Sequence, residues 1–139
     1  MDQIIYLDAN IFLEVLLCQE KVGESESLLR KIASNSIRAV ISNFSIHSIA
    51  LMLDRCKKSP EDIKIFLISL RSYTGLSIYS PSIADTVIAS GYMKKFGLDF
   101  EDSLVLQCCL ATGCKTIVSF DKDFDGISVI KRMTPSQIN

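Results

Sequence analysis

The stretch LDFEDSLVLQCCLATGCKTIVSFDKDF, residues 98–124, predicts a buried helix followed closely by a buried strand, with acids outside both elements. Residues 104–111 carry little polarity and are numerous enough for a helix, and Gly113 stands where many helices end in a left-handed residue. Residues 116–118 predict a short, buried strand. The acids on either side of these two elements are Asp99, Glu101, Asp102, Asp121, Asp123 and Asp125.

The rest of the chain alternates short apolar strands with helical patterns, with two helices between most pairs of strands. This order predicts a single α/β domain over residues 1–139, a three-layer α/β/α sandwich on a mainly parallel sheet of four to five strands. Asn10 is the expected N-cap of the first helix, and Ser42 or Asn43 that of the third. Strands are expected at 4–7, 38–41, 76–79 and 116–118, with a short fifth at 128–130, and helices at 11–17, 21–35, 44–57, 60–73, 81–96 and 104–111.

Composition argues against a strongly basic nucleic-acid-binding protein. The 139 residues carry a formal net charge of -1, and 48% of them are hydrophobic, enough for one sizeable core. Non-specific binding to nucleic acid depends on clustered Lys and Arg, so any such affinity must come from a local basic rim. Candidates for that rim are Lys94, Lys95, Lys115, Lys122, Lys131 and Arg132.

Five cysteines without a CxxC pair predict free thiols in a reducing, cytoplasmic setting. A single histidine, His47, makes a Cys/His zinc site a poor fit. The first residues carry Asp2 and only a short apolar run before Asp8, which predicts neither a signal peptide nor a membrane span.

Three acids are expected to meet at one edge of the sheet. Asp8 ends the first strand, Asp121 lies just past the fourth, and Asp102 belongs to the first turn of the helix that leads into the fourth. Ligand sites in open parallel sheets lie beyond the carboxyl ends of the strands. Three crowded carboxylates need either protons or a cation, and oxygen ligands without His or Cys favour Mg²⁺ or Mn²⁺.

Each of these acids also has a simpler interpretation, because an Asp after a strand is often a turn residue or a helix cap. For Asp99 and Glu101 a solvated surface is the better interpretation. Asp123 and Asp125 are most simply turn residues, although Asp123 is also a candidate outer ligand. The case for a metal site therefore depends on the three acids together.

The same segments resemble the PIN-domain family of metal-dependent ribonucleases, which includes the VapC-like toxins. The resemblance covers nearly the whole chain and is carried by LDANIF (7–12), LDFEDSLVLQCCLATGC (98–114) and TIVSFDKDF (116–124). It implies a small α/β sandwich, Mg²⁺- or Mn²⁺-dependent endonucleolytic cleavage of RNA, homodimers and often a small antitoxin in the active cleft. By matching motif positions it implies metal-binding roles for Asp8, Asp102 and Asp121, with Asn10 and Ser119 beside the site.

The sequence departs from the family in the helix after the second strand, where the family usually has a glutamate. Our alignment places Ser48, preceded by His47, at that position. A hydroxyl supplies no charge to a metal, although it can hydrogen-bond a bound water. His47 is either a ligand of a metal or phosphate or, more commonly on an apolar helix, a hydrogen-bonded structural residue. Asp99 is a further substitute if its helix starts early enough.

Two functions therefore remain open within the family: a metal-dependent endoribonuclease that is the toxin of a toxin–antitoxin pair, and a PIN domain that binds RNA or a protein partner without cutting. A phosphoacceptor receiver is disfavoured because residues 79–81 offer no acceptor Asp. A phosphatase with a DxD motif is disfavoured because Asn10 stands at the second acidic position.

Overall fold

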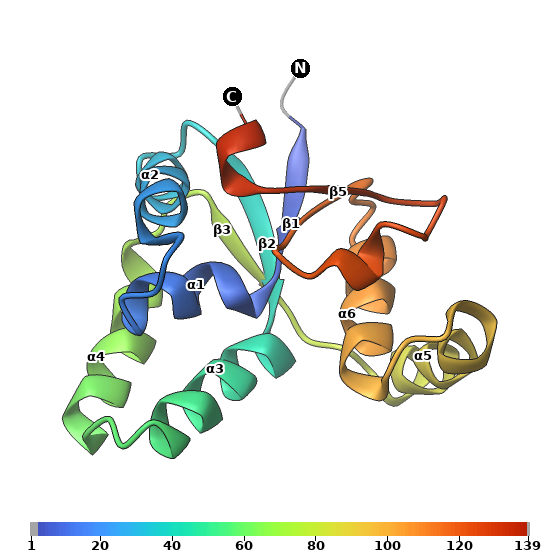
Figure 1. Cartoon of the computed structure of the whole chain (residues 1–139), viewed down its shortest axis with the longest axis horizontal. Helices are drawn as coiled ribbons and strands as arrows, with labels where there is room; N and C mark the ends of the chain where they lie inside the picture. The colour runs from blue at the N-terminus through green and yellow to red at the C-terminus, as the bar shows by residue number, and fades with distance from the viewer. Residues whose placement is uncertain (1–2, 139) are drawn as a thin grey trace.

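The computed structural model describes residues 3–138, whose centre is a five-stranded sheet. The strands lie in the order β3-β2-β1-β4-β5 and every neighbouring pair is parallel, as Figure 1 shows. The mainly parallel α/β sandwich expected from the sequence is confirmed. The strand bounds are β1 Ile4–Leu7, β2 Arg38–Ser42, β3 Leu76–Tyr79, β4 Thr116–Val118 and β5 Lys131–Met133.

Helices cover both faces of the sheet, with α1 to α4 on one side and α5 and α6 on the other (Figure 1). Three short 3-10 turns, η1 Leu70–Ser72, η2 Lys122–Phe124 and η3 Pro135–Gln137, complete the described elements. The helix bounds are α1 Ala9–Leu16, α2 Val22–Ala33, α3 Asn43–Arg55, α4 Pro60–Ser69, α5 Ile83–Phe96 and α6 Phe100–Ala111.

Side chains of the central strand β1 contribute to two separate hydrophobic cores. Ile5 and Leu7 pack into the core beneath α1 to α4, whereas Tyr6 packs into the core beneath α5 and α6. Successive side chains of a strand point to opposite faces, so a strand covered on both sides needs apolar residues at every position. That requirement explains the uninterrupted apolar run before Asp8.

Side-chain caps set the starts of most helices. Ser59 accepts a hydrogen bond from the backbone N–H of Asp62 at the start of α4, and Ser82 with Asp85 forms a capping box at the start of α5. Ser42 caps α3, as one of the two expected alternatives. The expected cap of α1 was wrong: Asp8, not Asn10, is its N-cap, because the helix begins directly where β1 ends.

The fifth strand also differs from the expectation at residues 128–130. It lies three residues later, at Lys131–Met133, where Lys131 pairs with Thr116 of β4. Two of its three residues are basic and none is fully buried, so β5 lacks the apolar run by which an inner strand is found. No helix within residues 3–138 combines the length and the apolar character that crossing a membrane requires.

Candidate metal centre

The carboxyl ends of β1 and β4 lie side by side and bring two distant segments together. Leu7 pairs with Val118, and the backbone N–H of Asp8 donates to the carbonyl oxygen of Val118 at 3.0 Å. The hydroxyl of Ser119 then donates to Oδ2 of Asp8 at 2.6 Å. The side-chain amide of Asn10 donates to the Ser119 hydroxyl oxygen at 3.2 Å and, more weakly, to Asp8 at 3.4 Å.

Asp8 is a buried acid with a fixed orientation. Only 8% of the residue is exposed, and its Oδ1 accepts the N–H of Ala9 at 2.8 Å. Burial raises its pKa to about 6, while the hydrogen bonds from Ser119 and Ala9 act in the opposite direction and nearby acids add to the rise. Burial of the Asp8 carboxylate therefore carries a desolvation cost, and a positive charge nearby would offset that cost.

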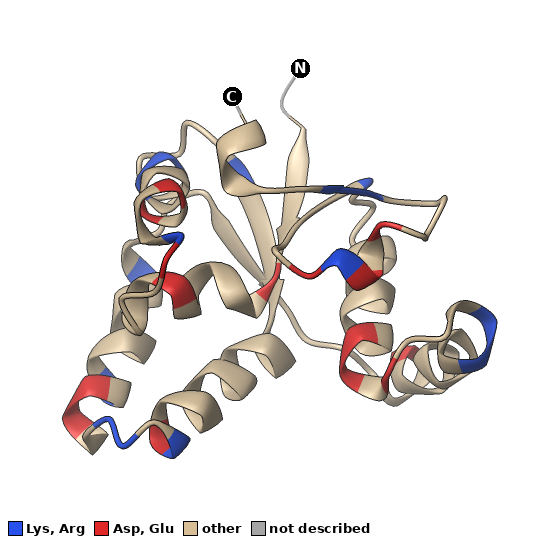
Figure 2. Cartoon of the chain, in the orientation of Figure 1, with Lys and Arg blue, Asp and Glu red and all other residues tan. Residues whose placement is uncertain are grey.

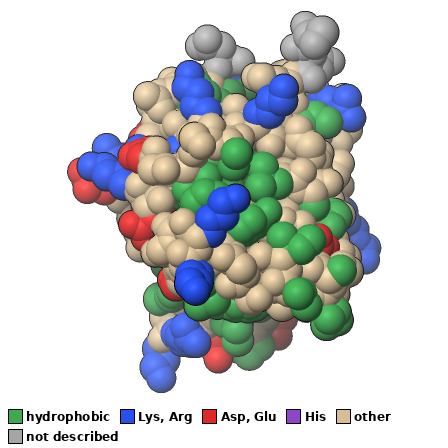
Figure 3. All heavy atoms as spheres, turned by 90° about the vertical axis from the view of Figure 1, so that its right-hand side faces the viewer, with side chains coloured by type: hydrophobic (Ala, Val, Ile, Leu, Met, Phe, Trp, Pro, Cys, Tyr) green, Lys and Arg blue, Asp and Glu red, His purple; other side chains and the backbone are tan. Residues whose placement is uncertain are grey.

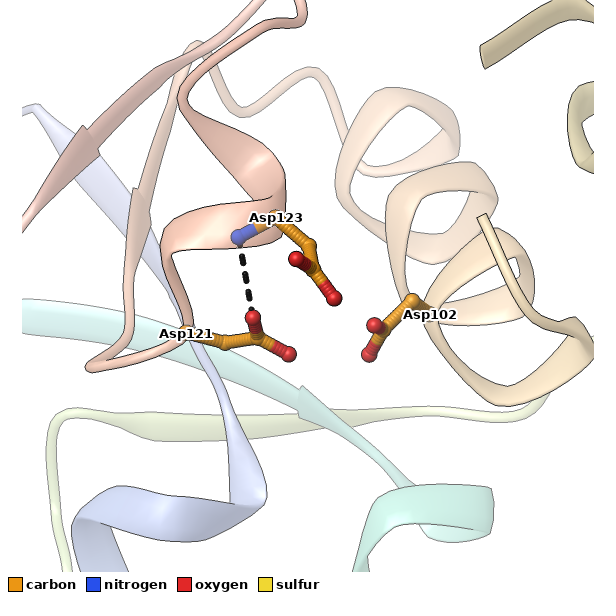
Figure 4. A group of neighbouring side chains, drawn as sticks. All are labelled: Asp102, Asp121 and Asp123. Carbon is orange, nitrogen blue, oxygen red and sulfur yellow. Dashed lines mark hydrogen bonds between the residues drawn. The ribbon is translucent and has the colours of Figure 1, made fainter. Parts of the chain in front are cut away.

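Three further acids meet beside Asp8. Asp102 in the first turn of α6, Asp121 after β4 and Asp123 in η2 each offer a carboxylate oxygen, and these oxygens lie within 4.8 Å of one another. Figure 4 shows Asp102 pointing from α6 toward Asp121 and Asp123. Oδ1 of Asp121 accepts the N–H of Asp123 at 2.9 Å, and the N–H of Asp121 donates to the Ser119 hydroxyl oxygen at 2.9 Å.

The charge on this group is too concentrated for all of its acids to ionise freely. Burial raises the pKa of Asp102 to about 8, with further contributions from the carboxylates of Asp121, Asp99 and Asp8. A divalent cation removes this conflict as a proton does, and a donor set made only of oxygens suits Mg²⁺ or Mn²⁺. The residues present therefore fit such an ion.

A cleft of about 190 Å³ lies beside Asp8 and Asp102, between α1, α3 and α6. It is lined by Asp8, Glu101 and Asp102, with Arg55 among the residues from α3. Figure 2 shows that acidic residues mark the start of α6 and the loop after β4.

Of the remaining residues predicted for the site, some line the cleft and others do not. Ser48 lines the cleft, but His47, its neighbour on α3, is exposed and makes no hydrogen bond among the described residues, so it is not the hydrogen-bonded structural residue expected. Asp99 is the N-cap of α6, where Oδ1 accepts the N–H of Asp102 at 2.8 Å. Asp99 thus positions Asp102 and lies outside the group of converging oxygens.

Two residues have roles that the sequence did not indicate. Glu101 is exposed, as expected, and in addition accepts a hydrogen bond from Ser48 at the cleft at 3.2 Å. Arg132, a candidate for the basic rim, instead pairs with Asp125 at 2.6 Å and donates to the carbonyl of Ser119 at 3.0 Å. Its guanidinium thereby supports the turn that carries Asp121.

Comparison with known proteins defines the family. The PIN domain family model matches residues 5–130, so the chain belongs to the PIN-domain family. No curated protein matches the sequence.

Several solved structures share the fold at low sequence identity. A chain of a toxin–antitoxin complex from Klebsiella pneumoniae is 15% identical, with a TM-score of 0.70, over 96% of this chain and 99% of that one. VapC20 of Mycobacterium tuberculosis, described as a sarcin–ricin loop cleaving toxin, is 16% identical, with a TM-score of 0.72, over 89% and 95%. A chain of VapBC2 from Rickettsia felis, bound to a promoter DNA fragment, is 19% identical, with a TM-score of 0.71, over 95% and 98%.

Proposed function

We propose that this protein is a metal-dependent endoribonuclease of the VapC type, acting as the toxin of a toxin–antitoxin pair. The observation that carries the proposal is the meeting of Asp102, Asp121 and Asp123 at the sheet edge where Asp8 is already held. Family membership and the similarity to VapC20, a toxin described as cleaving the sarcin–ricin loop, support RNA as the substrate.

In this proposal Asp8, Asp102 and Asp121 would hold Mg²⁺ or Mn²⁺, and Asp123, whose carboxylate converges with those of Asp102 and Asp121, is a candidate outer ligand. When bound, the ion would supply charge to polarise the scissile phosphate and would lower the pKa of an attacking water. The protein's own residues set the geometry: Ser119 fixes Asp8 and the backbone of Asp121 at once, and Asp99 fixes the first turn that carries Asp102. Lys122, exposed between Asp121 and Asp123, is placed to meet an RNA phosphate beside the acids.

We also propose an antitoxin partner and a cytoplasmic location. Toxin–antitoxin assemblies among the structural neighbours support the partner, and five free cysteines support the reducing compartment. The acidic cleft suits a basic side chain of such a partner.

A homodimer is the third part of the proposal. Figure 3 looks onto the side of the molecule that carries α5, where hydrophobic side chains gather with Lys and Arg around them. Ile83 and Val87 of α5 are 81% and 65% exposed, and Ile78 of the edge strand β3 is 52% exposed. Exposed apolar surface of this kind favours contact with a second copy. Light scattering on the wild type and on Val87→Glu tests it, since a dimer through this face becomes a monomer in the variant.

Cleavage of RNA by the purified protein tests the main proposal. A labelled RNA incubated with Mn²⁺ is expected to be cut by the wild type, and cleavage should fall at least about 100-fold in Asp8→Asn. Asp54→Asn, which removes an exposed acid at the end of α3, is the matched control and should cut normally. Equal residual cleavage in wild type and Asp8→Asn, unchanged by chelation of the metal, would reject the proposal.

The neutral side chain of Ser48 at the cleft favours a second candidate, a PIN domain that binds RNA or protein without cutting it. That candidate predicts RNA retention in a mobility-shift assay with no cleavage at any Mn²⁺ concentration. Cleavage lost in Asp8→Asn excludes it.

A further inference from the structure

Glu101 extends from α6 into the cleft and contacts a helix from the opposite wall. The hydroxyl of Ser48 donates to its Oε2 at 3.2 Å, a contact between residues 53 positions apart in the chain. Both residues line the same cleft as Asp8 and Asp102. Glu101 is exposed and lies outside the group of converging oxygens, but its carboxylate borders the same cleft as Asp8 and Asp102.

Helix geometry explains how adjacent acids reach different parts of one site. Consecutive residues of an α-helix point about 100° apart. In the first turn of α6, Asp102 points toward Asp121 and Asp123, while Glu101 reaches Ser48 on α3. The N-terminus of α6 favours negative charge at both positions.

The pairing orients the carboxylate. The hydroxyl of Ser48 donates to Oε2 of Glu101 and holds that side chain on the α3 side of the cleft. Glu101 is also among the charges that raise the pKa of Asp8, which places it within electrostatic range of the buried acid. α3 itself contributes no acid to the wall at this point, because the residues it supplies there are Ser45, Ser48, Leu51, Met52 and Arg55.

We propose that Glu101 is the fourth carboxylate of the metal site, supplying negative charge on the α3 side, and that Ser48 is the positioning residue that holds it in the cleft. The inference rests on the proposed function, because it assigns a further ligand group to the same ion. It also accounts for an active site in a chain whose α3 carries a hydroxyl where the family resemblance leads one to expect an acid.

Mn²⁺ binding measured by calorimetry on the full chain tests the inference without any substrate. Glu101→Gln should weaken Mn²⁺ binding about 10-fold or more, as removal of a supporting ligand group commonly does. Glu20→Gln, at an exposed turn outside the cleft, is the matched control and should bind like the wild type. Circular dichroism and thermal unfolding establish that each variant is folded.

A second series of variants tests whether Ser48 positions the carboxylate of Glu101 or only packs against it. Ser48→Ala should weaken Mn²⁺ binding about 3- to 10-fold, and Ser48→Thr, which keeps the hydroxyl, should restore it. The double variant Ser48→Glu with Glu101→Gln moves the carboxylate to α3 and should bind more tightly than Glu101→Gln alone. A purely structural hydrogen bond predicts instead that Ser48→Ala binds Mn²⁺ like the wild type.

The outcomes distinguish this inference from the function on which it rests. If the wild type binds Mn²⁺, Asp121→Asn does not, and Glu101→Gln binds like the wild type, Glu101 makes only a surface hydrogen bond and the inference is wrong while the metal site stands. If the wild type itself fails to bind Mn²⁺, the proposed metal site is wrong and the inference is rejected with it.

Discussion

Ser119 ties together two acids that lie far apart in the chain: its hydroxyl donates to Asp8 at 2.6 Å and its oxygen accepts the backbone N–H of Asp121 at 2.9 Å. The contact with Asp8 spans 111 positions in sequence. It is possible because β1 and β4 are parallel neighbours whose carboxyl ends lie together. One buried hydroxyl therefore sets the relative position of the two strand ends on which the site is built.

Replacing Ser119 by Ala should destabilise the protein and loosen the site together. Asp8 is buried, so losing its short hydrogen bond should lower the free energy of unfolding by about 1–3 kcal/mol. The same change should raise the pKa of Asp8 further, since the Ser119 hydrogen bond lowers it. Urea unfolding measures the first effect, with Ser128→Ala at an exposed position as the control. Unfolding curves that coincide for Ser119→Ala and the wild type would contradict this role.

Strand-end acids were predictable from the sequence because parallel strands offer few places for polar residues. Because β1 and β4 are buried on both faces, polar residues cluster just beyond the strand ends, at Asp8 after β1 and at Ser119 and Asp121 after β4, and the apolar runs alone locate both segments. The start of α6 was likewise visible in its acids, although its N-cap Asp99 has a positioning role that composition did not reveal.

Side-chain direction was not predictable in the same way. Glu101 and Asp102 are adjacent acids in one helical turn, and only the placement of α3 against α6 shows that Glu101 meets Ser48. Asp123 joins the site because η2 turns its carboxylate back toward Asp121, a local geometry that a KDF sequence does not specify. These features depend on packing between distant segments, which the local sequence pattern does not contain.

Gly75 is expected to tolerate no side chain, although its backbone lies outside the left-handed region. A Cβ at this position would lie 2.4 Å from the carbonyl oxygen of Ile37 and 2.7 Å from that of Ile32. Gly75→Ala should therefore lower the free energy of unfolding by about 1–3 kcal/mol, because the start of β3 must move away from this backbone.

The matched substitution is Gly23→Ala in the first turn of α2, where a Cβ meets nothing within 4 Å. It should leave stability unchanged or raise it by about 0.5–1 kcal/mol, because Ala favours the helix. Chemical unfolding of the two variants side by side gives the comparison. Equal effects of the two substitutions would show that the β3 start can relax around a methyl group.

The metal-free protein should lose stability as the pH rises through the neutral range. The folded-state pKa values of Asp8 and Asp102, about 6 and about 8, lie above the ordinary value of 3.8, so between these limits the folded protein binds more protons than the unfolded chain. The stabilising effect of these protons is fully present below about pH 4 and is lost as the pH rises through 6 and 8. Asp85 acts in the opposite sense, but its pKa is lowered to about 2, so its contribution is lost only in acid.

Thermal unfolding in the presence of a chelator, at about pH 5 and about pH 9, measures this trend. The melting temperature should be lower at the higher pH, and Asp102→Asn should reduce the difference because it removes the group with the larger shift. Stabilisation by added Mn²⁺ should increase with pH, since the ion competes with protons for the same oxygens. A metal-free protein that becomes more stable toward about pH 9 would contradict the raised pKa values.

Asp121→Asn should have opposite effects on the metal-free and metal-bound protein. Asparagine keeps an oxygen that can accept the N–H of Asp123, so the turn after β4 retains its local hydrogen bond. The substitution removes a carboxylate that raises the pKa of Asp102. At neutral pH the metal-free variant should therefore be more stable than the wild type by about 1 kcal/mol, or about 2–5 °C in melting temperature.

With saturating Mn²⁺ the order should reverse, because the wild type gains binding free energy that the variant has lost. Asp125→Asn is the informative control, since Asp125 pairs with Arg132 and lies outside the converging oxygens. Asp125→Asn should lower the melting temperature both with and without Mn²⁺. The rise in melting temperature that Mn²⁺ causes should stay the same as in the wild type. A metal-free Asp121→Asn protein less stable than the wild type would mean that Asp121 holds the turn together through its charge, and that crowding of acids is not what Mn²⁺ relieves.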